Sequence, residues 1–515
     1  MDLAGLLGSL QTIGKAPKRV FGILEASRLR PACGILKAAG ARLIALWGSD
    51  ETQTPEAPCA FALHVAFVLG PEVGLIWLAV PLETPQYPSL HDIFPDAVRM
   101  QRAAFDMSGL LALHSHDTRK WLRHGAWPEG AFPLRKDFSG VFPPQPDDYP
   151  FVSVEGEGVS EIPVGPVHAG TIEPGHFRFS VVGEKVLRLE ERLGYKHKGI
   201  EKRFEELDIM GGARLAGRIS GDSTVAYAWA YAMAIENATG TVPPWRALWL
   251  RALWLERERV ANHLGDLGAI GNDAGFALGL AHFSRLKEDL LRANLALTGH
   301  RYLMDAIVPG GVVLDPQDRL EGVIQEAEAL RREVRELKAI YDDHSGLQDR
   351  FRGTGRLSLA LVERLGVVGL AARASGKPMD ARVDFPCAPY DQLQPSAAIQ
   401  TEGDVAARVA VRFAEIEASL GLWQTIVQGM PQGDTLAPLR SEPYAPVGVG
   451  WVEGWRGEVL IALALGDRGS LARVHAHDPS WQNWPALEHA ILENIVPDFP
   501  LINKSFNLSY AGHDL

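Results

Sequence analysis

The segment from Val323 to Tyr341 reads VIQEAEALRREVRELKAIY and decides the fold of the larger part of the chain. Apolar residues recur in it at alternating intervals of four and three, at Val323, Ala327, Leu330, Val334, Leu337 and Tyr341. This spacing places them along one face of an α-helix, with charged residues on the opposite face. The segment therefore predicts a long amphipathic helix that packs its apolar stripe against a neighbour.

Other helices and strands are expected on both sides of this segment. Pro243 and Pro244 can open a helix that runs to about His263, because proline fits the first helical turn, where the backbone needs no intrahelical donor. Apolar and polar residues alternate around a turn between 176 and 190, which predicts a β-hairpin. The last segment, 444–515, should alternate short strands with a helix near 484–495.

The N-terminal part has a different pattern. Residues 61–82 are apolar, but a Gly-Pro-Glu-Val-Gly break at 70–74 interrupts them, so they predict two strands around a turn and no membrane span of about 20 residues. A Pro-, Gly- and Asp-rich run follows at 139–149 and has the composition of a linker. We therefore expect an α+β protein with a small α/β domain at 1–140, a linker at 141–160 and a mainly helical domain with peripheral β-hairpins at 161–515.

Composition excludes several classes of function. The 515 residues include 51 Lys and Arg against 63 Asp and Glu, and this net charge of −12 argues against nucleic-acid binding. Met1-Asp2-Leu3 lacks the basic flank and apolar core of a secretory signal, so we expect the chain to stay in the cytoplasm. The three cysteines, which form no CxxC pair, cannot ligate a four-cysteine zinc or a self-contained iron–sulfur cluster; they are Cys33, Cys59 and Cys387.

A nucleotide-binding loop is also not expected. Gly448, Gly450 and Gly454 are wrongly spaced for a dinucleotide fingerprint, and no acidic residue follows at the distance that such a motif requires.

Short blocks in the N-terminal part carry a resemblance to a known family. Pro88–Pro95, Phe105–Met107 and Phe132–Phe138, the last reading Phe-Pro-Leu-Arg-Lys-Asp-Phe, stand in the order and at the spacing found near the end of one subunit of respiratory complex I. Residues 1–140 thus resemble its 30-kilodalton subunit.

The remainder resembles the 49-kilodalton subunit of complex I and the large subunit of group-four membrane hydrogenases, the hydrogenase-4 and formate hydrogenlyase type. The segments that carry this resemblance are Gly165–His168, Glu173–Arg178, Tyr195–Lys202, Ala234–Asn237, Glu256–His263, Pro309–Val312 and Asp498–Pro500. The form Glu-Pro-Gly-His-Phe-Arg at 173–178 is closer to the hydrogenase branch. The chain thus resembles a fusion of the two subunits.

The resemblance fails at the residues that hold the hydrogenase metal. The family uses two cysteine pairs, whereas here the matching segments read Arg-Ile-Ser-Gly-Asp-Ser at 218–223 and Asn-Leu-Ser-Tyr-Ala-Gly at 507–512. Nickel and iron in such a site need charged sulfur donors, which hydroxyl groups and a glycine cannot replace. We therefore expect no nickel–iron centre, no metal ligand in this chain and no hydrogenase activity.

The resemblance implies that these two segments meet and line one cavity. The polar residues that would line it are Arg218, Ser220, Asp222, Ser223, Ser509, Tyr510 and His513. Such a set can bind a polar headgroup, of which quinone is the expectation from complex I, and can pass protons. The alternative is a remnant cavity filled by a hydrogen-bonded network that serves structure alone.

Two further groups are candidates by the same resemblance. His168, Glu173 and His176 should border the cavity on a loop and hairpin, where a carboxylate beside imidazoles can shuttle protons. Glu256, Arg259, His263 and Asp273 could form a buried charge relay, although structural ion-pair networks give the same pattern. Asp273 matches the complex I aspartate that supports a quinone-binding histidine, whereas the quinone-binding tyrosine falls on Gly221 and the histidine falls near Glu173.

The expected function is that of a subunit of a membrane-attached oxidoreductase complex, coupling electron transfer to quinone or another acceptor and to ion translocation. The resemblance implies a small iron–sulfur partner subunit, membrane antiporter-like subunits, and a peripheral position at the cytoplasmic face of the inner membrane. No cofactor is expected on this chain alone, since NAD and iron–sulfur clusters would belong to partners. The alternative is a non-catalytic assembly scaffold.

Overall fold

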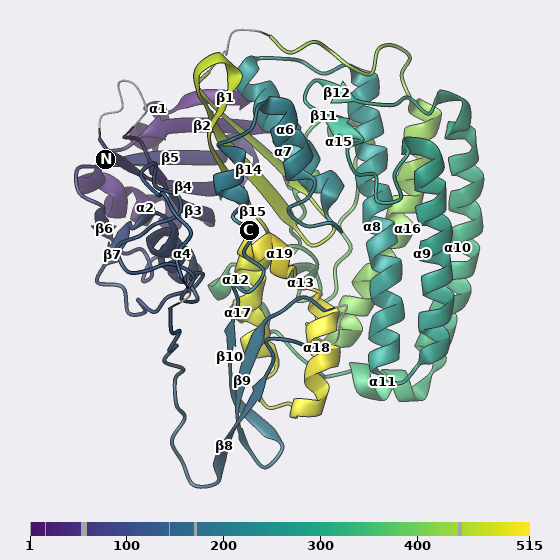
Figure 1. The fold of residues 1–515 in the computed structure, drawn as a ribbon. Helices are drawn as coiled ribbons and strands as arrows, with labels where there is room; N and C mark the ends of the chain where they lie inside the picture. The colour runs from purple at the N-terminus through teal and green to yellow at the C-terminus, as the bar shows by residue number, and fades with distance from the viewer. Residues whose placement is uncertain (1, 16, 53–58, 144, 169–171, 441–444) are drawn as a thin grey trace.

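The computed structural model describes residues 2–15, 17–52, 59–143, 145–168, 172–440 and 445–515. The N-terminal sheet domain lies on one side of the molecule, a bundle of long helices lies on the other, and a second small sheet separates them (Figure 1). This is the α+β architecture expected from the sequence. Most of the buried apolar side chains of both parts join in one continuous core.

The N-terminal domain is built on a five-stranded sheet in the order β1-β2-β5-β4-β3, in which only β2 and β5 are parallel. The strands are β1 (Gln11–Lys15), β2 (Lys18–Ile23), β3 (Arg42–Asp50), β4 (Phe61–Leu69) and β5 (Gly74–Leu82). The two strands predicted within 61–82 are confirmed, since Phe61 pairs with Leu82 around the short helix α3 (Gly70–Val73). The remaining elements are α1 (Leu3–Gly8), α2 (Leu29–Ala38), α4 (Ala97–Ser108), β6 (Gln86–Pro88) and β7 (Leu111–Leu113).

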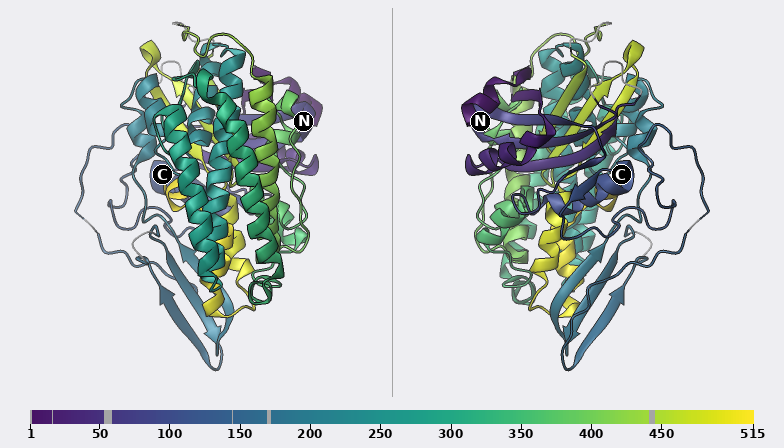
Figure 2. Two further views of the ribbon diagram at one scale, coloured as in Figure 1. Left: turned by 90° about the vertical axis from the view of Figure 1, so that its right-hand side faces the viewer. Right: turned by 90° about the vertical axis from the view of Figure 1, so that its left-hand side faces the viewer.

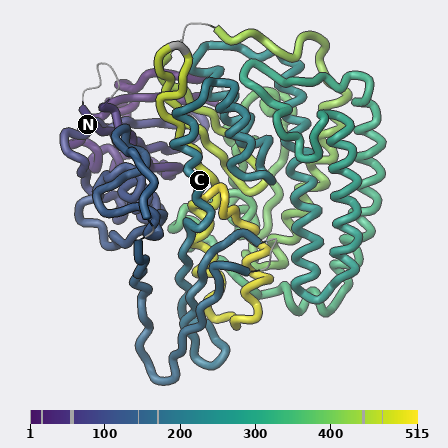
Figure 3. Tube along the Cα trace, viewed as in Figure 1, coloured from purple at the N-terminus to yellow at the C-terminus, as the bar shows by residue number. Residues whose placement is uncertain are grey.

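A long irregular connection leads out of this domain. The described residues from 114 to 158 contain no helix or strand, and Figure 3 shows them looping past the body of the molecule. Tyr149 is nevertheless buried, with the guanidinium of Arg192 4.2 Å from its ring centre, and Arg192 pairs with Asp147 at 2.7 Å. Part of the predicted linker is therefore held against the second domain.

The predicted hairpin at 176–190 is confirmed as β9 (His176–Val182) and β10 (Lys185–Arg192), to which β8 (Val159–Val164) adds a third strand. This sheet projects from the body of the molecule (Figure 2). Short elements precede the long helices or lie between them in the chain; they are α5 (Ile200–Phe204), α6 (Ile209–Ala216), β11 (Ile307–Val308), β12 (Gly311–Val312), α11 (Ser345–Phe351), α12 (Leu359–Leu365), α13 (Gly369–Arg373), α14 (Ala381–Asp384) and α15 (Tyr390–Leu393).

Long helices dominate the second domain. They are α7 (Thr224–Thr239), α8 (Trp245–Asp273), α9 (Ala277–Thr298), α10 (Leu320–Asp343) and α16 (Val405–Gly429). The predicted stripe is confirmed, because all six of its residues are buried on α10. The helix predicted after Pro244 begins there as α8 but runs ten residues beyond His263.

The C-terminal segment forms a three-stranded antiparallel sheet and three helices. They are β13 (Val447–Glu453), β14 (Glu458–Leu465), β15 (Leu471–His477), α17 (Ser480–Ala490), α18 (Phe499–Phe506) and α19 (Tyr510–Asp514). The helix predicted near 484–495 thus begins and ends earlier. β15 faces the N-terminal sheet, where the imidazole of His475 stacks on Trp47 with ring centres 4.3 Å apart.

Strand β13 lies directly on the backbone of α7, which explains two of its glycines. A Cβ atom at Gly450 would lie 1.8 Å from the carbonyl oxygen of Ala230, and one at Gly448 would lie 2.1 Å from that of Ala234. These glycines therefore serve close packing, in agreement with the rejection of a nucleotide loop.

Gly450→Ala is accordingly expected to destabilise the chain by about 3 kcal/mol or more, since strand and helix must separate to admit the added methyl group. Gly421→Ala on α16 is the matched control, because nothing lies within 4 Å of its added methyl group. Thermal unfolding of both variants measures the difference. Equal melting temperatures would contradict the packing described here.

Candidate functional site

The two serine-bearing segments meet, as the sequence predicts, although nearly 290 residues separate them. Ser220 lies in the turn between α6 and α7, and Ser509 caps α19. Their hydroxyl oxygens are 2.9 Å apart and both side chains are buried. The fold thus brings together the two halves of the predicted site.

A directed chain of hydrogen bonds runs through this contact. The Gly512 N–H donates to Ser509 Oγ at 2.8 Å, and the Ser220 hydroxyl donates to Asp222 Oδ1 at 2.7 Å. Because each hydroxyl carries one proton, the Ser509 hydroxyl must donate to Ser220. The chain therefore points toward the carboxylate of Asp222.

Asp222 is paired with Arg456, a residue that the sequence analysis missed. Arg456 lies in the turn between β13 and β14; its Nη1 donates to Asp222 Oδ1 at 2.9 Å and to Ser223 Oγ at 3.2 Å. Burial raises the pKa of Asp222, but Arg456 and the hydroxyl of Ser220 outweigh it and lower the pKa to about 2. The site therefore presents a fixed carboxylate–guanidinium pair.

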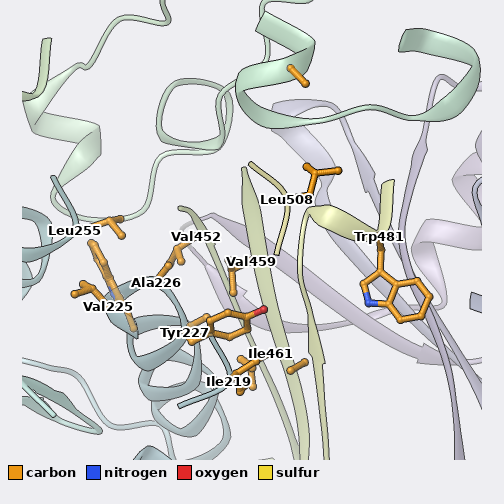
Figure 4. Close-up of a cluster of buried hydrophobic side chains, with 14 of the residues drawn as sticks. Ile219, Val225, Ala226, Tyr227, Leu255, Val452, Val459, Ile461, Trp481 and Leu508 are labelled. Carbon is orange, nitrogen blue, oxygen red and sulfur yellow. The ribbon is translucent and has the colours of Figure 1, made fainter. Parts of the chain in front are cut away.

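A second buried acid lies on the other side of the contact. The hydroxyl of Tyr227 donates to Asp478 Oδ2 at 2.7 Å, and burial followed by the charge of Asp478 raises the pKa of Tyr227 well above its usual value. Figure 4 shows Tyr227 among apolar side chains of α7, β13 and β14. These apolar neighbours exclude water from this side of the site.

Glu258 on α8 contacts the first turn of α7. Its carboxylate accepts the N–H groups of Val225 and Ala226 at 2.7 and 3.2 Å, which otherwise lack helical partners. Burial nevertheless raises the pKa of Glu258 to about 8, and the charge of Asp222 adds to the rise. Glu258 is thus largely protonated at neutral pH.

This shift predicts a pH dependence of stability. The carboxyl group has a pKa of 4.5 in the unfolded chain and of about 8 in the folded chain. Its contribution to the free energy of unfolding is therefore complete below pH 4.5 and is lost as the pH rises toward 8. Glu258→Gln is expected to flatten this fall, because an amide oxygen can accept the same N–H groups and does not ionise. Melting temperatures from pH 5 to 9 provide the check. If the melting temperatures of variant and parent changed in parallel with pH, Glu258 would already be ionised in the folded chain.

Other predicted residues lie elsewhere. The prediction for Arg218 is wrong, since its guanidinium points to the surface, is 41% exposed and pairs with Asp305 at 2.7 Å. His513 turns away from the site and stacks on Trp481 with ring centres 4.0 Å apart. Trp121 Nε1 of the N-terminal domain donates to His513 Nε2 at 3.4 Å. The side chains of Arg218 and His513 therefore find their partners outside the serine contact.

Tyr510 and the loop at 173–176 do border the meeting point. The Tyr510 ring packs so closely on Gly175 that an added Cβ there would lie 2.5 Å away, and Glu173 accepts the N–H of Ala511 at 3.0 Å. His168 and His176 bond to backbone carbonyls, those of Gly175 and Gly165 respectively. These two imidazoles therefore shape the loop.

The predicted relay is only partly assembled. Glu256, Arg259 and His263 are fully buried, and the imidazole of His263 lies 2.8 Å from Glu415. The prediction that Asp273 joins them is wrong. It stands ten residues further along α8, about 15 Å away at the helical rise, and is exposed.

The residues at the meeting point do not fit a nickel–iron centre. The hydroxyl groups at 220 and 509 satisfy each other, and a Cβ at Gly512 would lie 2.3 Å from Asp478 Oδ2, so a longer ligand has no room there. Among the described residues, no group of three or more His, Cys, Asp or Glu side chains is arranged to hold a metal ion.

Fold and site together define a class of protein. Residues 23–142 match the family of the respiratory-chain NADH dehydrogenase 30 Kd subunit, and residues 273–447 match that of the 49 Kd subunit. The chain is thus a fusion of both, and it is a subunit of a membrane-associated oxidoreductase complex. Within the described residues no helix is long and apolar enough to cross a membrane.

Sequence relatives narrow this class. The chain is 32% identical to formate hydrogenlyase subunit 5 of Escherichia coli K12, over 92% of this chain and 85% of the relative. Hydrogenase-4 component G of the same organism is 31% identical over 84% and 77%. The chain therefore belongs to the family of these hydrogenase subunits.

Two more similarities lie outside the hydrogenases. The C/D subunit of the NADH-quinone oxidoreductase of Phocaeicola vulgatus is 29% identical over 75% of this chain and 79% of the relative. A chain from the membrane-bound sulfane sulfur reductase, an archaeal respiratory membrane complex, has 25% identity and a TM-score of 0.65, covering 70% of this chain and 99% of that chain. The scaffold alternative is not favoured by these relatives.

Proposed function

We propose that this subunit binds a small electron acceptor, of which a quinone is the first choice, beside Asp222 and Arg456, and that a partner iron–sulfur subunit supplies the electrons. The observation that carries the proposal is the meeting of the 220–223 and 509–512 segments around hydroxyls and a charged pair. A guanidinium and hydroxyls can hold the carbonyl oxygens of a headgroup while charge develops on them.

The same proposal includes the rest of the complex. Membrane antiporter-like subunits would use the energy of electron transfer to move ions, and NAD would bind on a separate input subunit. The site would face the cytoplasm at the inner membrane, with this chain in a peripheral position. The names of the relatives support this arrangement, since they include a quinone oxidoreductase subunit and a component of a respiratory membrane complex.

Purification of the native complex tests both parts of the proposal. We expect it to contain an iron–sulfur subunit and to reduce a short-chain quinone analogue. It should show neither hydrogen oxidation nor stoichiometric nickel, because hydroxyl groups replace the required thiolates. Elemental analysis and subunit identification are the measurements. About one nickel per chain would overturn the assignment of the site, and a complex with no redox-active partner would favour a scaffold.

A further inference from the structure

Six charged side chains inside the helical domain form a closed ring of alternating sign. Arg382 bonds to Glu256 at 3.0 Å and to Asp380 at 2.6 Å. Arg373 lies 3.8 Å from Asp380 and donates to Glu415 at 2.9 Å. Arg259 closes the ring, at 3.4 Å from Glu415 and 3.3 Å from Glu256.

The ring is isolated from solvent and electrically neutral. None of its six side chains is more than 4% exposed. Tyr390 and Ser419 each donate a hydroxyl to Glu256 at 2.6 Å, which satisfies the carboxylate further. Three carboxylates and three guanidinium groups cancel, as the cost of burying charge demands.

Two ionisable groups are attached to the ring and break its balance. Glu453, at the end of β13, accepts from Arg373 Nη1 at 2.8 Å and from the Ala381 N–H at 3.2 Å. His263 on α8 donates Nε2–H to Glu415 at 2.8 Å, while its buried Nδ1 has no hydrogen-bond partner among the described residues. Glu453 is therefore a fourth carboxylate in a cluster that contains three arginines.

Charge counting shows what this arrangement requires. With Glu453 ionised and His263 neutral, the cluster carries one uncompensated negative charge in a dry interior, which is strongly unfavourable. One additional proton, on either group, restores neutrality. Burial, then Asp380 and Glu458, raise the pKa of Glu453 to about 7 against the opposing effect of Arg373. Asp384 on α14 faces the same region and adds no positive charge.

The surroundings of His263 oppose protonation there. Burial lowers its pKa, the carboxylate of Glu415 opposes this effect, and the guanidinium groups of Arg412 and Arg259 lower the pKa again. The ring of Trp455 packs edge-on with centres 6.0 Å apart and brings no charge. The proton should therefore reside mainly on Glu453.

The cluster is connected to the site by one short turn. Arg259 donates to the carbonyl oxygens of Glu453 and Gly454 at 2.9 and 3.2 Å. The next two residues contact the site. Trp455 Nε1 donates to the carbonyl oxygen of Asp222 at 2.8 Å, and Arg456 bonds to the carboxylate of Asp222. One turn thus bonds to the ring at one end and to the site at the other.

We propose that Glu453, with His263 as its secondary acceptor, is a proton-loading site that holds one exchangeable proton in the helical domain and releases or takes it up when the charge beside Arg456 changes. The presence of the proton follows from the cluster alone. Its coupling to turnover rests on the proposed function of the site.

Infrared spectroscopy of the full chain tests the proton directly. One buried neutral carboxyl band should disappear as the pH rises through about 7 and should be absent in Glu453→Gln, whereas the band of Glu258, whose pKa is about 8, should remain in that variant. Glu201→Gln is the matched control, because Glu201 is buried but its pKa is lowered to about 2, against the effect of burial, by Arg473 and His475. That variant should lose only an ionised carboxylate band.

Each outcome decides the proposal. Because glutamine imitates the protonated acid, Glu453→Gln should fold, and Glu453→Asp should retain a titrating band. If the glutamine variant fails to fold while the aspartate variant folds, position 453 needs its negative charge and the proposal is wrong. Loss of only an ionised carboxylate band from Glu453→Gln at pH 6 has the same meaning. Quinone reduction is measured separately, so failure of the site and failure of the proton store are distinguishable.

Discussion

Replacing Arg456 with glutamine is expected to lower quinone-linked turnover by about 10²–10³-fold, the usual cost of removing one charged donor that faces developing charge. The guanidinium bonds to Asp222 and Ser223 beside the serine contact, and under the proposed function it is the cation that would meet the headgroup. The stability loss should be smaller, about 1–3 kcal/mol, because Asp222 is 37% exposed and solvent screens the charge left behind. Acceptor reduction and thermal unfolding of the purified complex are the measurements.

Arg218→Gln is the matched control. Arg218 lies only two residues from Ser220, yet its guanidinium pairs with Asp305 at the surface. This variant should retain nearly full turnover and lose at most about 1 kcal/mol. If both arginine variants were equally inactive, a general disturbance of the 218–223 segment would explain the loss better than headgroup binding, because only Arg456 is buried at the serine contact.

The contrast between these two arginines shows how far the sequence could lead. The resemblance predicted correctly that the segments around Ser220 and Ser509 meet, because the topology of a family fixes which segments are neighbours. It did not predict the direction of each side chain. Arg218 leaves the turn after α6 toward solvent, whereas Arg456 enters the site from a β-turn.

A signal for Arg456 is nevertheless present in the sequence. Two apolar runs, 447–453 and 458–465, flank a Gly-Trp-Arg-Gly turn, which is typical of a β-hairpin that holds a charged residue at its tip. Comparison of the nearby glycines with a nucleotide motif does not reveal this hairpin. Their packing against α7 depends on long-range contact, which no local pattern reveals.

Helical periodicity also fails for the centre of the bundle. The stripe of α10 was predicted in full because that helix exposes one face. On α8, by contrast, the consecutive residues 256–259, Glu-Arg-Glu-Arg, are all buried, since neighbours surround the helix on every side. A charged run of this kind is normally interpreted as a solvated face, and only the partners supplied by α7, α10, α14 and α16 show that it lies in the core.

Replacing Arg373 with methionine is expected to have the largest effect on stability. The guanidinium donates to Glu415, to Glu453 and to the carbonyl of Met379, and it is fully buried. Without it, the carboxylates lose a shared cation in a dry interior. Removing one partner of a buried pair costs about 3–5 kcal/mol. Because total stabilities are about 5–15 kcal/mol, much of this variant should be unfolded or insoluble.

Arg335→Met is the surface control, since its side chain is 65% exposed and its bond to Glu417 should contribute less than about 1 kcal/mol. Acid gives a second test. Protonation of Glu453 removes one of the negative charges that Arg373 compensates. The loss of stability caused by Arg373→Met should therefore become smaller as the pH falls from 8 toward 5. Melting temperatures of both variants across this range are the measurement. If the melting temperature of Arg373→Met were lower than that of the parent by the same amount at every pH, lost packing rather than uncompensated charge would destabilise the variant.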